Sequence, residues 1–191
     1  MSKRVIVVHG WEGTPEKDWL PWLKNELEKK GFEVSVPTMP NTDEPKIETW
    51  VLHLKEQIGK PDKNTFLVGH SLGCQSILRY LEGLPKHSVV GGVILVAGFL
   101  NLNNLSKEEQ IIIKPWLTKK INLEKASSHT DKISAIFSDN DTWVPLSDSE
   151  IFKKRLEAKV IVMKNKGHFS GDEGIFKLPI VLEEILDFME Y

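Results

Sequence analysis

The chain has 191 residues, of which 40% are hydrophobic and 27% charged, and its formal net charge is -2. This length and composition are typical of one globular domain with a well-developed core. The small net charge gives no sign of binding to nucleic acid or to an anionic membrane surface. No apolar run approaches the ~18 residues of a membrane span.

A single cysteine, Cys74, excludes an internal disulfide, which fits a reducing compartment. The segment Met1-Ser2-Lys3-Arg4 runs directly into an apolar stretch and is too short for a secretory signal. We therefore expect a cytoplasmic protein.

Apolar and amphipathic segments alternate along the chain. The first apolar run, Arg4–His9, has no polar alternation, as expected for a strand buried on both faces. The next segment, Glu16–Lys30, is amphipathic, with Pro21 near its true first turn and Gly31 as its stop signal. Further strands are expected at Phe32–Pro37, Thr65–Val68, Val89–Val96, Lys132–Phe137 and Ala158–Met163, and further helices at Ile47–Ile58, Cys74–Glu82, Leu146–Leu156 and Leu178–Met189.

This order of elements predicts an α/β fold in which helices cover both faces of a parallel sheet, a three-layer α/β/α sandwich. The less regular stretch from Leu100 to about His129 is expected to be partly helical and to pass over the strand ends. No repeat or linker-like change divides the chain, so residues 1–191 are expected to form one domain. Ligands of such sheets bind beyond the carboxyl ends of the strands.

The stretch Gly69–Gly73 reads G-H-S-L-G and lies between an expected strand and an expected helix. Strand, G-x-S-x-G and helix together are the context of a nucleophile elbow, in which the central serine has strained backbone and projects from the sheet. Ser71 is therefore the candidate nucleophile. Because the same letters can form an ordinary glycine-rich turn, the interpretation depends on an acid and then a histidine farther along the chain.

Both partners occur after later strands. The acid is expected in Asp139–Pro145, where Asp141 is preferred because it precedes Val144-Pro145, and Asp139 is expected to order the turn. The base candidate is His168, in a glycine-histidine loop after the last strand. A serine nucleophile needs a base to accept its proton and an acid to hold that base in one tautomer.

The surroundings of Ser71 complete the predicted site. The backbone N–H groups of Leu72 and Trp11 are the expected oxyanion donors. Trp143 and Trp116 are candidates for lining a substrate pocket, although Trp11 and Trp143 could equally be packing residues. The histidine before the nucleophile, His70, is expected to point away from the pocket.

No set of residues has the spacing of a metal site, so neither a metal nor another cofactor is expected.

The chain resembles small α/β-hydrolases, and more narrowly the retinoblastoma-binding protein 9 family of compact serine hydrolases. The resemblance rests on V-V-H-G-W-E-G-T-P from Val7, W-L-P-W-L from Trp19, L-V-G-H-S-L-G from Leu67, D-N-D-T-W-V-P from Asp139 and K-G-H-F from Lys166. It implies a six-stranded parallel sheet in the order 2-1-3-4-5-6 without a large cap domain. It also implies a catalytic triad of Ser71, Asp141 and His168. The L-x-C-x-E peptide of human members lacks its final acid here, so their pocket-protein partner is not expected.

Together these features predict a serine hydrolase that cleaves a carboxylic ester, a thioester or a small amide through an acyl-enzyme on Ser71. The alternatives are a binding protein with a vestigial hydrolase site, and an acyltransferase. The expected partner is a small-molecule acyl substrate, with no nucleic acid and no membrane; the sequence points to no protein partner. It leaves acyl length, leaving group and oligomeric state open.

Overall fold

The structure is a computed structural model that describes residues 3–190. Within that range, six strands form one all-parallel sheet in the order β2-β1-β3-β4-β5-β6, which confirms the expected fold. The chain runs outward from β1 to β2 and returns to β3 on the other side of β1, so a topological switch point lies between β1 and β3. The strands are β1 Arg4–Val8, β2 Glu33–Ser35, β3 Thr65–His70, β4 Gly92–Val96, β5 Ile133–Ser138 and β6 Lys159–Met163.

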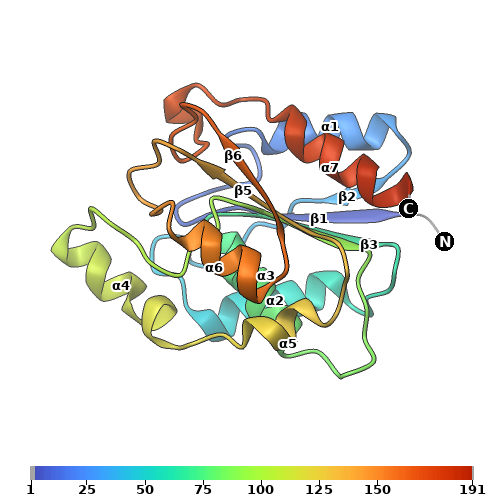
Figure 1. Ribbon diagram of the computed structural model, residues 1–191, viewed down its shortest axis with the longest axis horizontal. Helices are drawn as coiled ribbons and strands as arrows, with labels where there is room; N and C mark the ends of the chain where they lie inside the picture. Colours follow the sequence, from blue (N-terminus) through green and yellow to red (C-terminus); the bar gives the residue numbers. More distant parts are fainter. Residues whose placement is uncertain (1–2, 191) are drawn as a thin grey trace.

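Helices cover both faces of this sheet. Figure 1 shows α1 and α7 together on one face, and α2, α3, α5 and α6 on the other. Helix α4 lies beyond the edge toward which the strands run, at the end of the molecule away from the chain termini (Figure 1). The helices are α1 Leu20–Lys29, α2 Ile47–Ile58, α3 Leu72–Glu82, α4 Lys107–Thr118, α5 Leu123–Ser127, α6 Asp148–Arg155 and α7 Pro179–Glu190, with one 3-10 turn at Gly171–Glu173.

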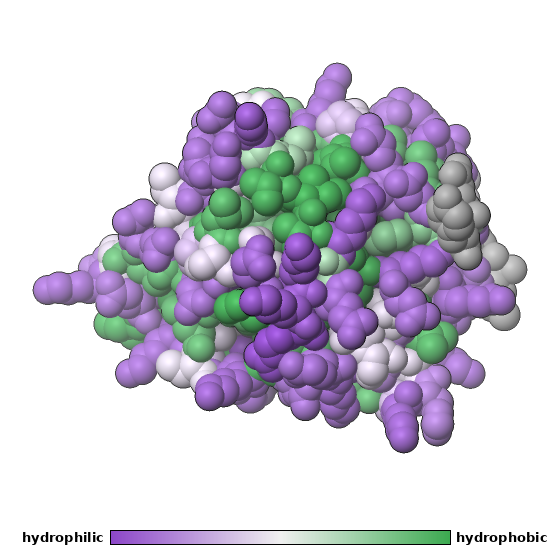
Figure 2. All heavy atoms as spheres, in the orientation of Figure 1, coloured by the Kyte–Doolittle hydropathy of each residue, from purple (hydrophilic) through white to green (hydrophobic). Residues whose placement is uncertain are grey.

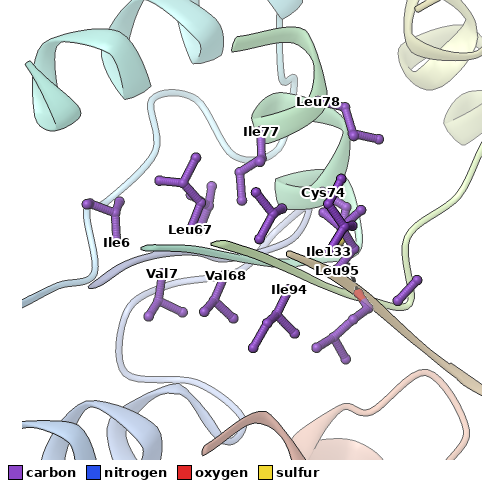
Figure 3. Packing of buried hydrophobic residues seen from close by; sticks show 14 of the residues in the cluster. Ile6, Val7, Leu67, Val68, Cys74, Ile77, Leu78, Ile94, Leu95 and Ile133 are labelled. Carbon is purple, nitrogen blue, oxygen red and sulfur yellow. Dashed lines mark hydrogen bonds between the residues drawn. The ribbon is translucent and has the colours of Figure 1, made fainter. Parts of the chain in front are cut away.

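The apolar strands are explained by burial on both faces. In Figure 3, Ile6 and Leu67 point toward α3, where Ile77 lies, whereas Val7 and Val68 point to the opposite face. Side chains alternate along a strand, so only a continuous apolar run can fill both layers. Every residue of β3, β4 and β5 is buried.

The outer strand β6 differs because its apolar side chains reach the surface. Val162 is 47% exposed, and Val160 is only partly buried. Figure 2 shows hydrophobic surface where Figure 1 places β6 and α7. Within the described part of the chain, β6 is therefore an edge strand of the sheet. The core lies around β1, β3 and β4.

Most expected segments are present with shifted ends. Helix α2 has the expected bounds, while α1 begins at Leu20 because Pro21 occupies its first turn. The stretch after β4 contains α4, which begins with a capping box between Ser106 and Glu109, and then α5. Within residues 3–190, no helix is both long enough and apolar enough to cross a membrane.

Candidate active site

The turn from β3 into α3 has the strained geometry of a nucleophile elbow. Ser71 has φ 52° and ψ -116°, in a region that non-glycine residues rarely occupy. Its N–H donates to the Val96 carbonyl at 2.9 Å, which ties the turn to the neighbouring strand β4. Gly73 lies beneath β1, where an added Cβ would come 2.2 Å from the Val8 carbonyl oxygen. The last glycine of the motif is therefore required by the close approach of α3 to the sheet.

His168 bridges the serine and an aspartate. Its Nε2 lies 2.9 Å from Ser71 Oγ, and its Nδ1 lies 2.8 Å from Asp141 Oδ2. A carboxylate only accepts hydrogen bonds, so Nδ1 carries the proton and Nε2 is free to accept the serine hydroxyl proton. Asp141, His168 and Ser71, which are separated by up to 97 positions in sequence, form one continuous chain of hydrogen bonds.

The surroundings of Asp141 keep it ionised. Its Oδ1 accepts the N–H groups of Trp143 at 2.8 Å and Val144 at 3.0 Å, so the other oxygen faces His168. Burial alone raises the pKa of Asp141, but the hydrogen bond and charge of His168, with the two backbone donors, lower it below its ordinary value. An ionised acid can hold the ring and stabilise an imidazolium.

Asp139, the other candidate acid, contacts the loop before His168 and not the His168 ring. Asp139 Oδ1 accepts the Asn165 N–H at 2.8 Å. Asn140 Oδ1 accepts the Gly167 N–H, also at 2.8 Å, and Ser138 Oγ accepts the N–H of the intervening Lys166 at 3.0 Å. In the D-N-D sequence, Asp139 and Asn140 therefore hold the loop before His168, and Asp141 contacts the ring of His168.

The expected oxyanion donors lie beside Ser71, the candidate nucleophile. Both Leu72 and Trp11 line the cavity that contains Ser71. Within residues 3–190, neither backbone N–H donates a hydrogen bond to another group. Gly10 brings the turn after β1 against the elbow, since an added Cβ would lie 3.1 Å from Ser71 Cβ.

The cavity over Ser71 has a volume of about 390 Å³ and combines an apolar lining with an acidic one. Its apolar residues include Phe99 and Leu102 after β4 and Ile113 from α4. Four carboxylates also line it, and the lining within the described residues includes no lysine or arginine. The full lining is Trp11, Glu12, Ser71, Leu72, Phe99, Leu102, Glu109, Ile113, Trp143, His168, Ser170, Asp172 and Glu173. The excursion between β4 and β5 therefore forms one wall of the site.

One expected lining residue is elsewhere. Trp143 lines the cavity, but Trp116 is 1% exposed and packs edge-on against Trp50. The indole N–H of Trp116 donates to the Pro45 carbonyl at 2.9 Å, and Arg79 lies over its ring. The expectation that Trp116 lines the pocket is wrong, because Trp116 packs against Trp50 of α2, one turn beyond the cavity; Ile113, one turn earlier on the same face of α4, borders the cavity instead.

The sequence pattern of the family described as "Serine hydrolase" matches residues 5–186. This match covers almost the whole chain, including the elbow and the histidine loop. The chain belongs to the serine hydrolase family. This confirms the resemblance found in the sequence and shows that the protein is a hydrolase by family.

Relatives of this serine hydrolase match over most of their length. The putative hydrolase YdeN of Bacillus subtilis (strain 168) is 34% identical, over 98% of this chain and 97% of the relative. The serine hydrolase RBBP9 of Rattus norvegicus is 24% identical, over 88% of this chain and 82% of the relative. The crystal structure of the ydeN gene product from B. subtilis superposes with a TM-score of 0.91 at 32% identity, over 100% of both chains. Est1E from Butyrivibrio proteoclasticus shares the fold, with a TM-score of 0.69 at 16% identity over 97% of this chain and 89% of Est1E.

Other reactive side chains of the hydrolase lie outside the cavity. Cys74 is fully buried in α3, and burial raises the pKa of its thiol. His9 Nε2 accepts the Met39 N–H at 3.0 Å and Nδ1 lies 2.8 Å from the Gly10 carbonyl, so this ring shapes the turn after β1. Among the described residues, no group of three or more histidine, cysteine, aspartate or glutamate side chains could hold a metal ion.

Sequence reasoning missed two contributions to the site. His70 does not enter the cavity, but its ring reaches the main chain of His168, which a local pattern does not show. The lining residues Glu109 and Ile113 come from α4, whose position depends on packing between distant segments. A usable signal existed only for the start of α4, where Ser106 precedes Glu109 by three residues.

Proposed function

We propose that this serine hydrolase cleaves a carboxylic ester, a thioester or a small amide through an acyl-enzyme formed on Ser71. One observation carries the proposal: the continuous hydrogen-bonded chain from Asp141 through His168 to Ser71 Oγ. A serine hydroxyl in that arrangement has a base within 2.9 Å to take its proton. We further propose that the protein acts in the cytoplasm, which its single, buried thiol supports.

Acylation begins at the elbow. Ser71 Oγ attacks the carbonyl carbon while its proton passes to His168 Nε2, and the carbonyl oxygen becomes an oxyanion. Asp141 stabilises the imidazolium that forms and keeps its Nδ1–H in place. The N–H groups of Leu72 and Trp11 are the proposed oxyanion donors, because neither has a hydrogen-bond partner among the described residues and both border the cavity. The N-terminus of α3 adds a favourable dipole at the same place.

Collapse of the tetrahedral intermediate and hydrolysis use the same groups. His168 gives its proton to the leaving oxygen, sulfur or nitrogen, and the carbonyl re-forms as an acyl ester of Ser71. Water then gives a proton to His168 Nε2 and attacks the acyl carbon, and collapse of this second intermediate returns the proton to Ser71 Oγ as the acid leaves. Acylation therefore passes the Ser71 proton to the leaving group, and hydrolysis restores it from water. No atom changes its oxidation state, so neither half-reaction requires a redox partner.

The shape of the cavity supports a small-molecule acyl substrate as the partner. A volume of about 390 Å³ lies within the range of small-ligand pockets. Phe99, Leu102 and Ile113 supply apolar contacts suited to an alkyl or aryl acyl chain. The carboxylates around the cavity favour substrates without a negative charge.

Hydrolysis of a series of short and medium acyl esters tests the proposal. We expect turnover by the wild type and its loss in Ser71→Ala. Ser76→Ala is the matched control, since Ser76 lies five residues later in α3 and its hydroxyl donates only to the Leu72 carbonyl within the described chain. Equal turnover in Ser71→Ala and the control would contradict the proposal. Absence of turnover in the wild type would favour the vestigial binding protein, and faster acyl transfer to an added alcohol than to water would favour the acyltransferase.

A further inference from the structure

His70, the last residue of β3, contacts the backbone of the proposed catalytic histidine from beneath the site. Its Nε2 lies 2.8 Å from the carbonyl oxygen of His168, and the two rings are 5.4 Å apart between centroids. A carbonyl only accepts hydrogen bonds, so His70 Nε2 carries the proton and donates it. His70 is 4% exposed and packs edge-on against Trp19, so its ring has a fixed orientation.

Asp18 holds the same loop at a second point. Its Oδ1 accepts the N–H of Gly171 at 2.6 Å, and its Oδ2 lies 3.9 Å from Nδ1 of His70. Asp18 has φ 58°, a conformation that costs free energy for a residue with a side chain. The segment before α1, far from the triad in sequence, is therefore held in a strained turn with its carboxylate toward the histidine loop.

The histidine loop needs such support because its backbone is strained just after His168. Phe169 has φ 59°, a conformation that costs free energy for a residue with a side chain, whereas Gly167 adopts its φ of 53° without strain. The side chains of Asn140 and Ser138 hold the residues before His168, but their contacts end at Gly167. In the described loop from His168 to Gly171, the hydrogen bonds to distant parts of the chain are those of the His168 ring with Ser71 and Asp141, of the His168 carbonyl with His70, and of the Gly171 N–H with Asp18.

We propose that Asp18 and His70 together are positioning residues, the Asp18–His70 anchor, which fixes the His168 main chain so that its Nε2 stays aligned with Ser71 Oγ. This inference rests on the proposed function of the triad. Neither residue lines the cavity, so the anchor acts on proton transfer through His168 and not on substrate binding. Loss of the anchor therefore lowers kcat and leaves KM nearly unchanged.

Four variants separate the hydrogen bonds from mere packing. His70→Leu removes the donor, whereas His70→Gln keeps an N–H donor the same number of bonds from Cα. Asp18→Ala removes the acceptor for Gly171, whereas Asp18→Asn keeps a carbonyl oxygen there. We expect kcat to fall about 10- to 100-fold in the first variant of each pair, because small misplacements of catalytic groups cost that much. The second variant of each pair should recover most of the rate.

His129→Leu is the matched control for loss of a buried histidine. His129 is 1% exposed, and its Nδ1 lies 2.8 Å from the Ser88 carbonyl, so its ring also contacts a backbone carbonyl. It precedes β5 and therefore lies near the amino ends of the strands, whereas Ser71 and His168 follow their carboxyl ends. We expect its melting temperature to fall as in His70→Leu, with kcat unchanged. If His70→Leu does not fold, the Asp18 pair makes the same comparison at the other anchor point.

The measurements are kcat and KM on one acyl ester, with the rate of Ser71 labelling by a fluorophosphonate probe. The anchor would be overturned if kcat stayed at the wild-type value in both His70→Leu and Asp18→Ala, or if the conservative variants did not recover the rate. The proposed function would still stand in either case, provided that the probe labels the wild type at Ser71 and does not label Ser71→Ala. A loss of rate in His129→Leu equal to that in His70→Leu would also overturn it. Absence of labelling in the wild type would overturn the proposed function and the anchor together.

Discussion

Gly73 lies so close beneath the Val8 carbonyl that a side chain at this position would begin 2.2 Å from the carbonyl oxygen. The contact joins the first turn of α3 to β1, and so holds the elbow next to the turn that carries Gly10 and Trp11. The proposed nucleophile and the proposed oxyanion donor from the turn after β1 are therefore brought together by one backbone contact that only glycine permits.

Gly73→Ala should destabilise the protein by at least about 1–3 kcal/mol, the usual cost of overpacking a core. The backbone atoms of Val8 belong to a central strand and have little room to move. Chemical denaturation measures the change in the free energy of unfolding. Gly83→Ala, at the other end of α3, is the control, because its Cβ would meet no atom closer than 3.4 Å and its φ is -79°. Equal stability of the two variants would contradict this account of the elbow.

Asp141→Asn should lower kcat about 10⁴-fold, because an amide in place of the acid favours the wrong tautomer of His168. Asp139→Asn should cost far less, since its amide oxygen can still accept the Asn165 N–H. Steady-state kinetics of the two variants on one ester makes the comparison. A greater loss in Asp139→Asn would assign the acid role to the other aspartate.

Stability should depend on pH through two buried histidines, His70 and His9. Burial, and then the nearby His168, lower the pKa of His70 to about 4, and burial also lowers the pKa of His9. Because an unfolded histidine titrates near ~6.5, the unfolded chain binds more protons between that pH and about 4. The free energy of unfolding should therefore fall as the pH falls through this window, by up to about 1.4 kcal/mol per pH unit for each histidine.

His70→Gln tests that assignment because its amide does not titrate. Urea unfolding at several pH values from about 7 to 4 should show a shallower slope than in the wild type, with the His9 contribution retained. Above the pKa of an unfolded histidine, His70 is neutral in both the folded and the unfolded state, so it adds no pH dependence to the free energy of unfolding there. Identical slopes in the variant and the wild type would show that His70 is not the titrating group.

The charge of the cavity should select among substrates. Glu12, Glu109, Asp172 and Glu173 line it, and within the described chain no lysine or arginine does. A p-nitrophenyl butyrate should therefore have a kcat/KM about 10-fold or more above that of the matched hemisuccinate, which adds a carboxylate. Added salt should reduce the difference, because salt screens exposed charges.

Glu12→Gln with Asp172→Asn is the matching variant for this selection. The carboxylates of Glu109 and Glu173 are left in place because they cap the N–H groups of Ser106 and Ser170. Discrimination between the two esters should shrink in the double variant. Equal rates on both esters in the wild type would show that the acidic lining does not act on the substrate.

Local patterns predicted the fold well. Helix α2 has the expected bounds, because apolar residues at helical spacing precede a glycine stop signal at Gly59. The central strands were predictable because burial on both faces leaves a continuous apolar run. The ends of α1 and β4 shifted, where proline and paired glycines change the backbone locally. Family resemblance supplied the strand order, which no local pattern carries.

Contacts between distant segments were harder to predict. Trp116 was expected at the pocket, yet it is buried against Trp50 one turn farther along the same face of α4, and Ile113 borders the cavity instead. His70 was placed correctly outside the pocket, but its bond to the His168 carbonyl spans 98 residues and has no sequence signal. The partners of Ser71 could be expected from their order after successive strands, whereas their supporting contacts required the three-dimensional structure.

The central claim is that Ser71 is the nucleophile, and peptide mapping after reaction with a fluorophosphonate tests it most directly. We predict one covalent adduct per chain, on the peptide that contains Ser71, with labelling abolished in Ser71→Ala and retained in Ser76→Ala. An adduct on another residue, or undiminished labelling of Ser71→Ala, would contradict the account.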